Sequence, residues 1–281
     1  MDAPVIDAAL VRALVAEQFP QWAALPVQFV PQGNDHRTFR LGDALSVRLP
    51  SAEGYVPQSE KEHRWLPLLA PQLPLPIPEP IALGQPSALF PFPWSVYGWL
   101  EGEVLPTEAV VTDPRLAEEL AGFLLALQAA DSEGPPPGVH SAFRGCPPGV
   151  WDEDVRRCIP LLGADAGRAA RVWEEAGAAI TAAPVWFHGD IAPGNLLLRG
   201  GRLAAVLDFG CSGVGDPACD VAAAWMMFDD EARSVFLEVL SPDEGMLRRG
   251  RGWALWKALL WVESGGVETA HGRRVVDAVL G

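Results

Sequence analysis

The sequence HGDIAPGN at residues 188–195, followed by DFG at residues 208–210, decides the fold. Asp190 and Asn195 lie five positions apart in a loop that contains a proline and a glycine, so both side chains can turn into one cleft. Two short apolar stretches with a glycine turn between them separate the motifs, a pattern typical of a hairpin. Such a hairpin would return Asp208 to the side of the loop, and we expect the three side chains to converge.

A carboxylate, a carboxamide and a second carboxylate are the groups that phosphoryl transfer requires. The reaction needs a base that orients the attacking hydroxyl, hard oxygen ligands for magnesium, and positive charge on the phosphates. Each residue alone has an ordinary alternative, because Asp190 and Asn195 also form turns and Asp208 could cap a strand end. The three together, in this order, favour a kinase.

The chain before this motif has the pattern of a small sheet with two helices. Residues 5–19 and 57–69 have helical apolar spacing, although Pro67 leaves open whether the second helix ends or kinks early. The proline-dense stretch 71–80 predicts an extended connector. Five stretches alternate or are rich in β-branched and aromatic residues, and predict strands: 27–30, 38–41, 45–49, 81–83 and 94–97.

The chain after residue 98 is mainly helical. Residues 114–130 predict an amphipathic helix with Asp113 as its N-cap and Pro114 at its first position. Further helices are expected at 150–162, 164–182 and within 217–280, and hairpin strands at 195–198 and 203–207. We therefore divide the chain into a β-rich nucleotide-binding lobe, 1–98, and a helical lobe, 99–281, with the catalytic loop, the metal site and the acceptor site.

The H-x-D-x-x-x-x-N loop followed by D-F-G is the signature of the protein-kinase-like superfamily. With glycine before Asp190 and GDPACD at 215–220, the chain resembles the aminoglycoside phosphotransferase family over nearly its whole length. The resemblance implies an α+β, protein-kinase-like two-lobed fold: an N-terminal antiparallel β-sheet lobe and a larger, mainly helical C-terminal lobe. It also implies Asp190 as the catalytic base, Asn195 and Asp208 as magnesium ligands, and Asp220 as a support of the catalytic loop.

Two absences indicate a small-molecule substrate rather than a protein. A protein kinase usually has arginine before the catalytic aspartate, to receive an activation-loop phosphate, and this chain has Gly189. It would also have A-P-E after D-F-G, and no such sequence follows Gly210.

The resemblance also implies nucleotide-binding residues in the first lobe. Gly33 and Asn34 lie between two predicted strands, where a loop could cover the phosphates or form a plain hairpin turn. Arg48 stands where the family usually has lysine, and its planar guanidinium differs from an ammonium although the charge is kept. Glu62 is the expected helix acid, with Glu60 as the alternative. The adenine is expected against the hinge, 96–100, which includes Tyr97 and Trp99.

The expected reaction moves the γ-phosphoryl of ATP or GTP, with Mg²⁺, to a hydroxyl of a small molecule. Aminoglycoside-like antibiotics are the leading acceptor class; macrolides and metabolic alcohols are alternatives, as is a nucleotide-binding pseudokinase without catalysis. Trp253, Trp256 and Trp261 are expected to pack in the core rather than to form a substrate platform. Three clusters of acidic residues could bind a cationic acceptor, or could simply be solvated residues at helix starts. They are Asp152, Glu153, Asp154, Asp229, Asp230, Glu231, Asp243 and Glu244.

Composition restricts the partners. The 21 basic and 36 acidic residues give a net charge of −15, which would repel nucleic acid and anionic membranes, attract a cationic substrate, or simply maintain solubility. We expect neither a nucleic-acid nor a membrane partner. The N-terminus lacks signal-peptide features, charged residues interrupt the apolar runs, and four scattered cysteines predict buried thiols in a reducing cytoplasm. The oligomeric state is not predicted.

Overall fold

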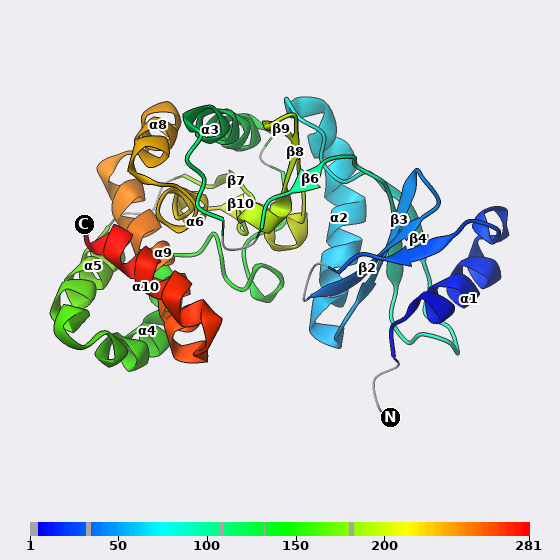
Figure 1. The fold of residues 1–281 in the computed structure, drawn as a ribbon, viewed down its shortest axis with the longest axis horizontal. Helices are drawn as coiled ribbons and strands as arrows, with labels where there is room; N and C mark the ends of the chain where they lie inside the picture. The colour runs from blue at the N-terminus through cyan, green and yellow to red at the C-terminus, as the bar shows by residue number, and fades with distance from the viewer. Residues whose placement is uncertain (1–4, 32–34, 107–108, 132, 180–182) are drawn as a thin grey trace.

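A computed structural model describes residues 5–31, 35–106, 109–131, 133–179 and 183–281. Two lobes lie side by side, one built on a β-sheet and the other mainly of helices (Figure 1). None of the helices within the described residues is both long and apolar enough to cross a membrane.

The first lobe contains a five-stranded antiparallel sheet. Across the sheet the strands are β1 (Val27–Phe29), β2 (His36–Leu41), β3 (Leu45–Pro50), β5 (Trp94–Gly98) and β4 (Pro80–Gly84). Each strand lies within about two residues of its predicted range. Gly42, with φ +62°, turns the chain between β2 and β3, a conformation that glycine adopts without steric cost.

Two helices pack on this sheet, α1 (Ala8–Gln18) and α2 (Val56–Leu69). Because side chains alternate along a strand, Val47 and Leu49 of β3 pack in the core shared with α1, whereas Arg48 points to the other face, toward α2. This alternation brings a strand cation to a helix acid.

Pro67 does not end the second helix, which continues to Leu69. Pro67 lies in the last turn of α2 and has no N–H to donate, so the helix lacks one backbone hydrogen bond near its end. Leu66 and Leu69 are buried in the core that continues into the helical lobe.

The second lobe is built around the long buried helices α3 and α9. Asp113 caps α3 through its side chain, which accepts from the N–H of Arg115, as predicted. The helices are α3 (Pro114–Ala129), α4 (Asp152–Cys158), α5 (Ala166–Ala178), α6 (Ala218–Val221), α7 (Ala223–Met226), α8 (Asp230–Leu240), α9 (Glu244–Ser264) and α10 (Val267–Leu280).

Short strands in this lobe carry the motifs. The predicted hairpin is present as β8 (Leu196–Arg199) and β9 (Arg202–Val206), and β6 (Glu103–Val104) adds a third strand beside β8. The sequence did not predict β6, nor the pair β7 (Val185–Phe187) and β10 (Gly213–Gly215), because strands of two or three residues give no clear periodicity. An antiparallel sheet lobe followed by a mainly helical lobe confirms the predicted fold class.

A buried ion pair joins the segment after the D-F-G motif to α9. Asp216 Oδ2 accepts from Arg249 Nε at 2.6 Å, and the two side chains are 3% and 1% exposed. Asp216 Oδ1 also accepts from the N–H of Ala218, the first residue of α6. Its pairing with a cation 33 positions later was not foreseen.

Replacing Arg249 by alanine is expected to lower the free energy of unfolding by about 3–5 kcal/mol, because Asp216 would stay buried without its cation. Arg248→Ala, at the preceding position of α9, removes only an exposed pair with Glu244 and should change stability by less than about 0.5 kcal/mol. Urea unfolding followed by circular dichroism measures both. A loss below about 1 kcal/mol for Arg249→Ala would contradict the expectation.

Candidate active site

The loop that carries Asp190 is held by a buried carboxylate, Asp220. Its two oxygens accept from the backbone N–H groups of His188 and Gly189, both at 2.7 Å. Asp220 is 1% exposed and lies in α6, so a rigid element of the helical lobe fixes the loop. This is the supporting role that the resemblance implied for Asp220.

Gly189 has a backbone that few other residues adopt. Its φ is +83°, and a Cβ at this position would lie 2.8 Å from the carbonyl oxygen of Cys211. Glycine is therefore required by both conformation and space, which gives a physical reason why no arginine precedes Asp190.

Asp190 receives two side chains from different elements. The amide nitrogen of Asn195 donates to the Asp190 carbonyl at 2.8 Å and to its Oδ2 at 3.4 Å. From the loop before α4, Arg144 places Nη2 3.5 Å from Asp190 Oδ1. The Asp190 side chain is 39% exposed, so it remains accessible to a substrate.

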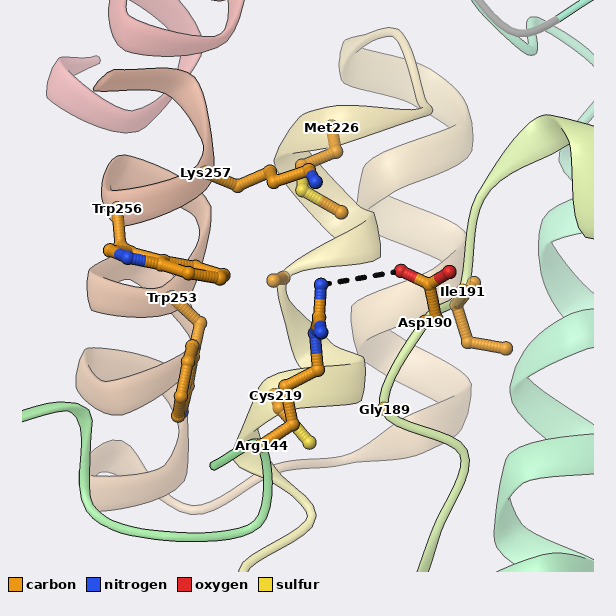
Figure 2. Close-up of a pocket in the computed structure, with 10 residues that line it drawn as sticks. Arg144, Gly189, Asp190, Ile191, Cys219, Met226, Trp253, Trp256 and Lys257 are labelled. Carbon is orange, nitrogen blue, oxygen red and sulfur yellow. Dashed lines mark hydrogen bonds and ion pairs between the residues drawn. The ribbon is translucent and has the colours of Figure 1, made fainter. Parts of the chain in front are cut away.

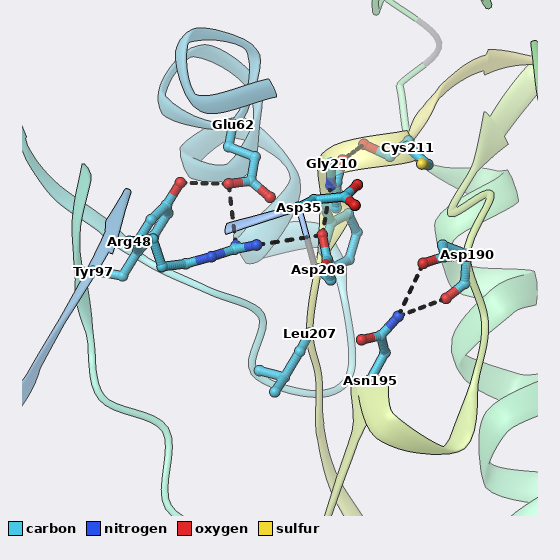
Figure 3. A network of polar contacts seen from close by, with 12 residues as sticks. Asp35, Arg48, Glu62, Tyr97, Asp190, Asn195, Leu207, Asp208, Gly210 and Cys211 are labelled. Carbon is cyan, nitrogen blue, oxygen red and sulfur yellow. Dashed lines mark hydrogen bonds and ion pairs between the residues drawn. The ribbon is translucent and has the colours of Figure 1, made fainter. Parts of the chain in front are cut away.

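The hairpin returns Asp208 to this loop, as the sequence predicted. The backbone N–H of Leu207 donates to the carbonyl of Asn195 at 2.8 Å, and the His188 ring contacts the Leu207 carbonyl through Nε2 at 2.9 Å. Asp190, Asn195 and Asp208 therefore lie at one end of the β8–β9 hairpin, and Figure 3 shows them in one region between the lobes.

Asp208 has a left-handed backbone, with φ +61° and ψ +72°, and its Oδ1 accepts from the N–H of Gly210 at 3.3 Å. Oδ1 also lies 3.5 Å from Arg48 Nη2, so a cation of the first lobe contacts the second lobe. Burial alone would raise the pKa of Asp208, but Arg48 and His36 outweigh it and hold the pKa below its usual value. The carboxylate is therefore ionised at neutral pH.

Arg48 also pairs with the predicted helix acid. Its Nη1 lies 3.5 Å from Glu62 Oε2, and Glu62 is 3% exposed. The hydroxyl of Tyr97 donates to the same oxygen, and the guanidinium lies 5.6 Å from the centre of the Tyr97 ring. Burial raises the pKa of Glu62, although Arg48 opposes the rise. One guanidinium thus bridges a helix acid and the aspartate of the D-F-G motif (Figure 3).

The remaining residues predicted for the nucleotide site are placed as follows. Tyr97 is buried and its hydroxyl donates to Glu62, so its side chain offers no surface to an adenine ring. The Arg40 guanidinium lies 4.5 Å from the centroid of the Trp99 ring. The backbone N–H of Trp99 donates to the carbonyl of Ala44. Gly33 and Asn34 lie outside the described residues.

Two residues near the D-F-G segment were missed by sequence reasoning. Lys61, next to Glu62, donates from its ammonium to the carbonyls of Gly210 at 2.6 Å and Ser212 at 2.8 Å, and so fixes this segment to α2. Asp35 lies beside Asp208 in Figure 3, and burial together with Asp208 raises its pKa. Only the folded chain brings these residues to the site.

The donor set at the end of the hairpin suits magnesium. The Asn195 nitrogen is used by Asp190, which leaves its amide oxygen as a ligand, and the Asp208 carboxylate is a second hard oxygen donor. Among the described residues, no group of three or more histidine, cysteine or acidic side chains forms a self-contained metal site. Mg²⁺ is commonly held by one or two protein oxygens together with the phosphates of a nucleotide.

A small hollow adjoins Asp190 on the side of the helical lobe (Figure 2). We call it the Asp190 hollow. Its lining residues are Arg144, Gly189, Asp190, Ile191, Cys219, Ala222, Met226, Trp253, Trp256 and Lys257. Trp253 and Trp256 are buried, as predicted, but they also border this hollow, which the prediction of core packing alone did not include.

The acidic clusters lie elsewhere and mainly serve their own helices. Asp229 and Asp243 cap α8 and α9, and Asp152 accepts from Arg156 and Trp173. Of the described residues that line the Asp190 hollow, none belongs to these clusters. Asp229, Asp230 and Glu231 line a separate, more open pocket at the start of α8. The structure supports helix capping for Asp229 and Asp243.

Known proteins resemble this chain in sequence and in fold. The model of the "Phosphotransferase enzyme family" matches residues 26–259. Viomycin phosphotransferase from Streptomyces vinaceus is 29% identical over 55% of this chain, and the match spans only 57% of that relative's length.

Solved structures share the fold over almost the whole chain. The GDP and kanamycin complex of APH(2″)-IIia has a TM-score of 0.73 at 18% identity, covering 96% of this chain and 95% of the other. The macrolide 2′-phosphotransferase MphH from Brachybacterium faecium has a TM-score of 0.67 at 23% identity, covering 97% of each chain. The family expected from the H-G-D and D-F-G motifs is confirmed: this chain belongs to the phosphotransferase enzyme family and has its kinase-like fold.

Proposed function

We propose that this chain transfers the γ-phosphoryl of ATP or GTP to a hydroxyl of a small molecule, with Mg²⁺. The observation that carries the proposal is the convergence of Asp190, Asn195 and Asp208 at one end of the hairpin, with Arg48 above them. Relatives of the same fold were solved with GDP, ATP or ADP, which supports a nucleoside triphosphate as the donor.

Each residue then has a defined task. Asp190, exposed on one side and fixed by Asn195 on the other, orients the acceptor hydroxyl and takes its proton. Asn195 and Asp208 would hold Mg²⁺, which when bound neutralises charge on the phosphates. Arg48, positioned by Glu62, would contact the α- and β-phosphates. Gly33 and Asn34 remain candidates for a loop over the phosphates, and the hinge with Trp99 for the adenine.

The alternative of a pseudokinase rests only on Arg48 in the position of the usual lysine. The geometry weakens that argument, because Arg48 contacts both Glu62 and Asp208 at 3.5 Å. A guanidinium presents several donors in one plane, so it can span two carboxylates that a lysine would contact from a single point.

We also propose a cytoplasmic location. The four cysteines are free, and three of them are buried. Free thiols and a nucleoside triphosphate donor both fit a reducing cytoplasm, which is where we place the enzyme.

Asp190→Asn is expected to lower kcat by about 10²–10⁴-fold, because the variant loses the base but keeps the size of the side chain. Magnesium-dependent ADP or GDP release, with and without acceptors, measures the effect. Asp154→Asn is the matched control, since that acid pairs with Arg157 on α4 outside the hollow. Equal rates for wild type and Asp190→Asn would instead support a nucleotide-binding module.

Arg48→Ala is expected to raise the dissociation constant of the magnesium nucleotide by about 10- to 100-fold, because a charged contact to phosphate is lost. Arg37→Ala removes an exposed arginine from the neighbouring strand and should have no such effect. Titration calorimetry with MgATP and MgGTP compares the two, and Arg48→Lys tests whether charge alone suffices. Unaltered nucleotide affinity in Arg48→Ala would remove Arg48 from the site.

A further inference from the structure

The Asp190 hollow is a cationic space beside the catalytic aspartate. Its volume is about 30 Å³, so it would admit a small polar group, while the rest of a substrate would lie outside it. Within the described residues, Asp190 is the one carboxylate that lines it, against two cations, Arg144 and Lys257. Figure 2 shows both cations directed into the same space.

Arg144 is held in place on two sides. Its guanidinium lies 5.4 Å from the centre of the Trp256 ring and 3.5 Å from Asp190 Oδ1, and the side chain is only 12% exposed. Its Nη1 contacts the Ser141 carbonyl at 3.5 Å, which is long for an oxygen acceptor, and the neutral Cys211 sulfur at 3.5 Å. Arg144 is thus a buried cation with room for a stronger anionic partner.

The charge of Lys257 is balanced by fewer contacts than that of Arg144. No carboxylate forms an ion pair with it in the part of the chain that the structure describes; its ammonium lies 5.5 Å from the centre of the Trp261 ring. Burial and the nearby Arg144 lower its pKa. Two cations that share one carboxylate in a partly buried space repel each other, and a bound anion would offset that repulsion.

We propose that the acceptor carries an anionic group, a carboxylate or a phosphate, which binds between Lys257 and Arg144 while its hydroxyl faces Asp190. The proposal rests on the phosphotransferase function and names its substrate class. The buried side chains of Trp253 and Trp256 border the same space, and the Trp256 ring supports Arg144 from one side.

The net charge of −15 favours the opposite class, cations, but it acts at long range. Fields from distant surface charges are screened over about 8 Å at physiological ionic strength, whereas contacts inside a partly buried hollow are screened much less. The local cations therefore decide the class. An acceptor with several ammonium groups, such as an aminoglycoside, would bring like charge next to Lys257.

The test uses polyhydroxylated acceptors of different charge, of which glucose, glucose 6-phosphate and glucosamine share one ring. Gluconate and glucose 6-phosphate are the anionic probes and separate carboxylate from phosphate; quinate adds a carboxylate on a ring. Glucose is neutral, and glucosamine and kanamycin are cationic. Release of ADP or GDP and mass of the product are measured for each probe with the full chain, magnesium and either nucleotide.

We expect turnover of at least one anionic probe, with a KM that rises by about 10- to 100-fold in Lys257→Gln, because a charged contact to the acceptor is lost. Lys257→Arg retains the charge and should restore most of the affinity. Arg248→Gln, an exposed position of the same helix, is the control and should leave the KM unaltered. The KM for the nucleotide should be the same in wild type, Lys257→Gln and Lys257→Arg.

Turnover of kanamycin or glucosamine in preference to the anions, or a KM that Lys257→Gln does not raise, would overturn the proposal. The proposal would also be overturned if no anionic probe were phosphorylated while the enzyme still hydrolysed nucleotide in a reaction that depends on Asp190. Failure of the phosphotransferase function has a different signature: no magnesium-dependent release of ADP or GDP that Asp190→Asn diminishes.

Discussion

The site depends on one guanidinium that connects the two lobes. Arg48 leaves the sheet toward α2 because side chains alternate along β3, and there it meets Glu62 and Asp208 at 3.5 Å. Glu62 is buried and would be an uncompensated charge without it, and Asp208 owes its lowered pKa largely to it. The helix acid, the strand cation and the D-F-G aspartate are therefore one electrostatic unit, and a displacement of the lobes would disturb all three.

The catalytic loop has its own support, which comes entirely from the helical lobe. Asp220 accepts from two successive N–H groups, the His188 ring contacts the end of β9, and Gly189 allows the turn that neither a larger residue nor a negative φ would permit. Lys61 then connects this lobe back to α2 through two carbonyls of the D-F-G segment. The backbone before Asp190 is thus fixed by Asp220, while the Asp190 carboxylate stays exposed. A base that orients a substrate hydroxyl requires this combination.

Charge acts on this enzyme at two scales. The net charge of the chain is strongly negative, yet the space next to Asp190 is lined by two cations, Arg144 and Lys257, and by one carboxylate, that of Asp190. Composition alone therefore gives an incomplete account of the acceptor, since a substrate interacts most strongly with the groups it touches in a partly buried space. The same fold is shared by aminoglycoside and macrolide phosphotransferases, so the fold does not by itself select an acceptor, and the proposal assigns that selection to the residues that line the hollow.

The sequence by itself determined the two-lobed fold, the five sheet strands, the hairpin and the three motif residues, because these depend on local periodicity, turn residues and short spacings. It left open whether Pro67 ends or kinks its helix, and it did not predict the strands β6, β7 and β10, because strands of two or three residues give only weak local signals. Only the tertiary structure brought Arg144 and Lys257 to Asp190 and Arg249 to Asp216. These residues lie far from their partners in the chain, and their meeting is decided by how the helices pack, which no local pattern contains.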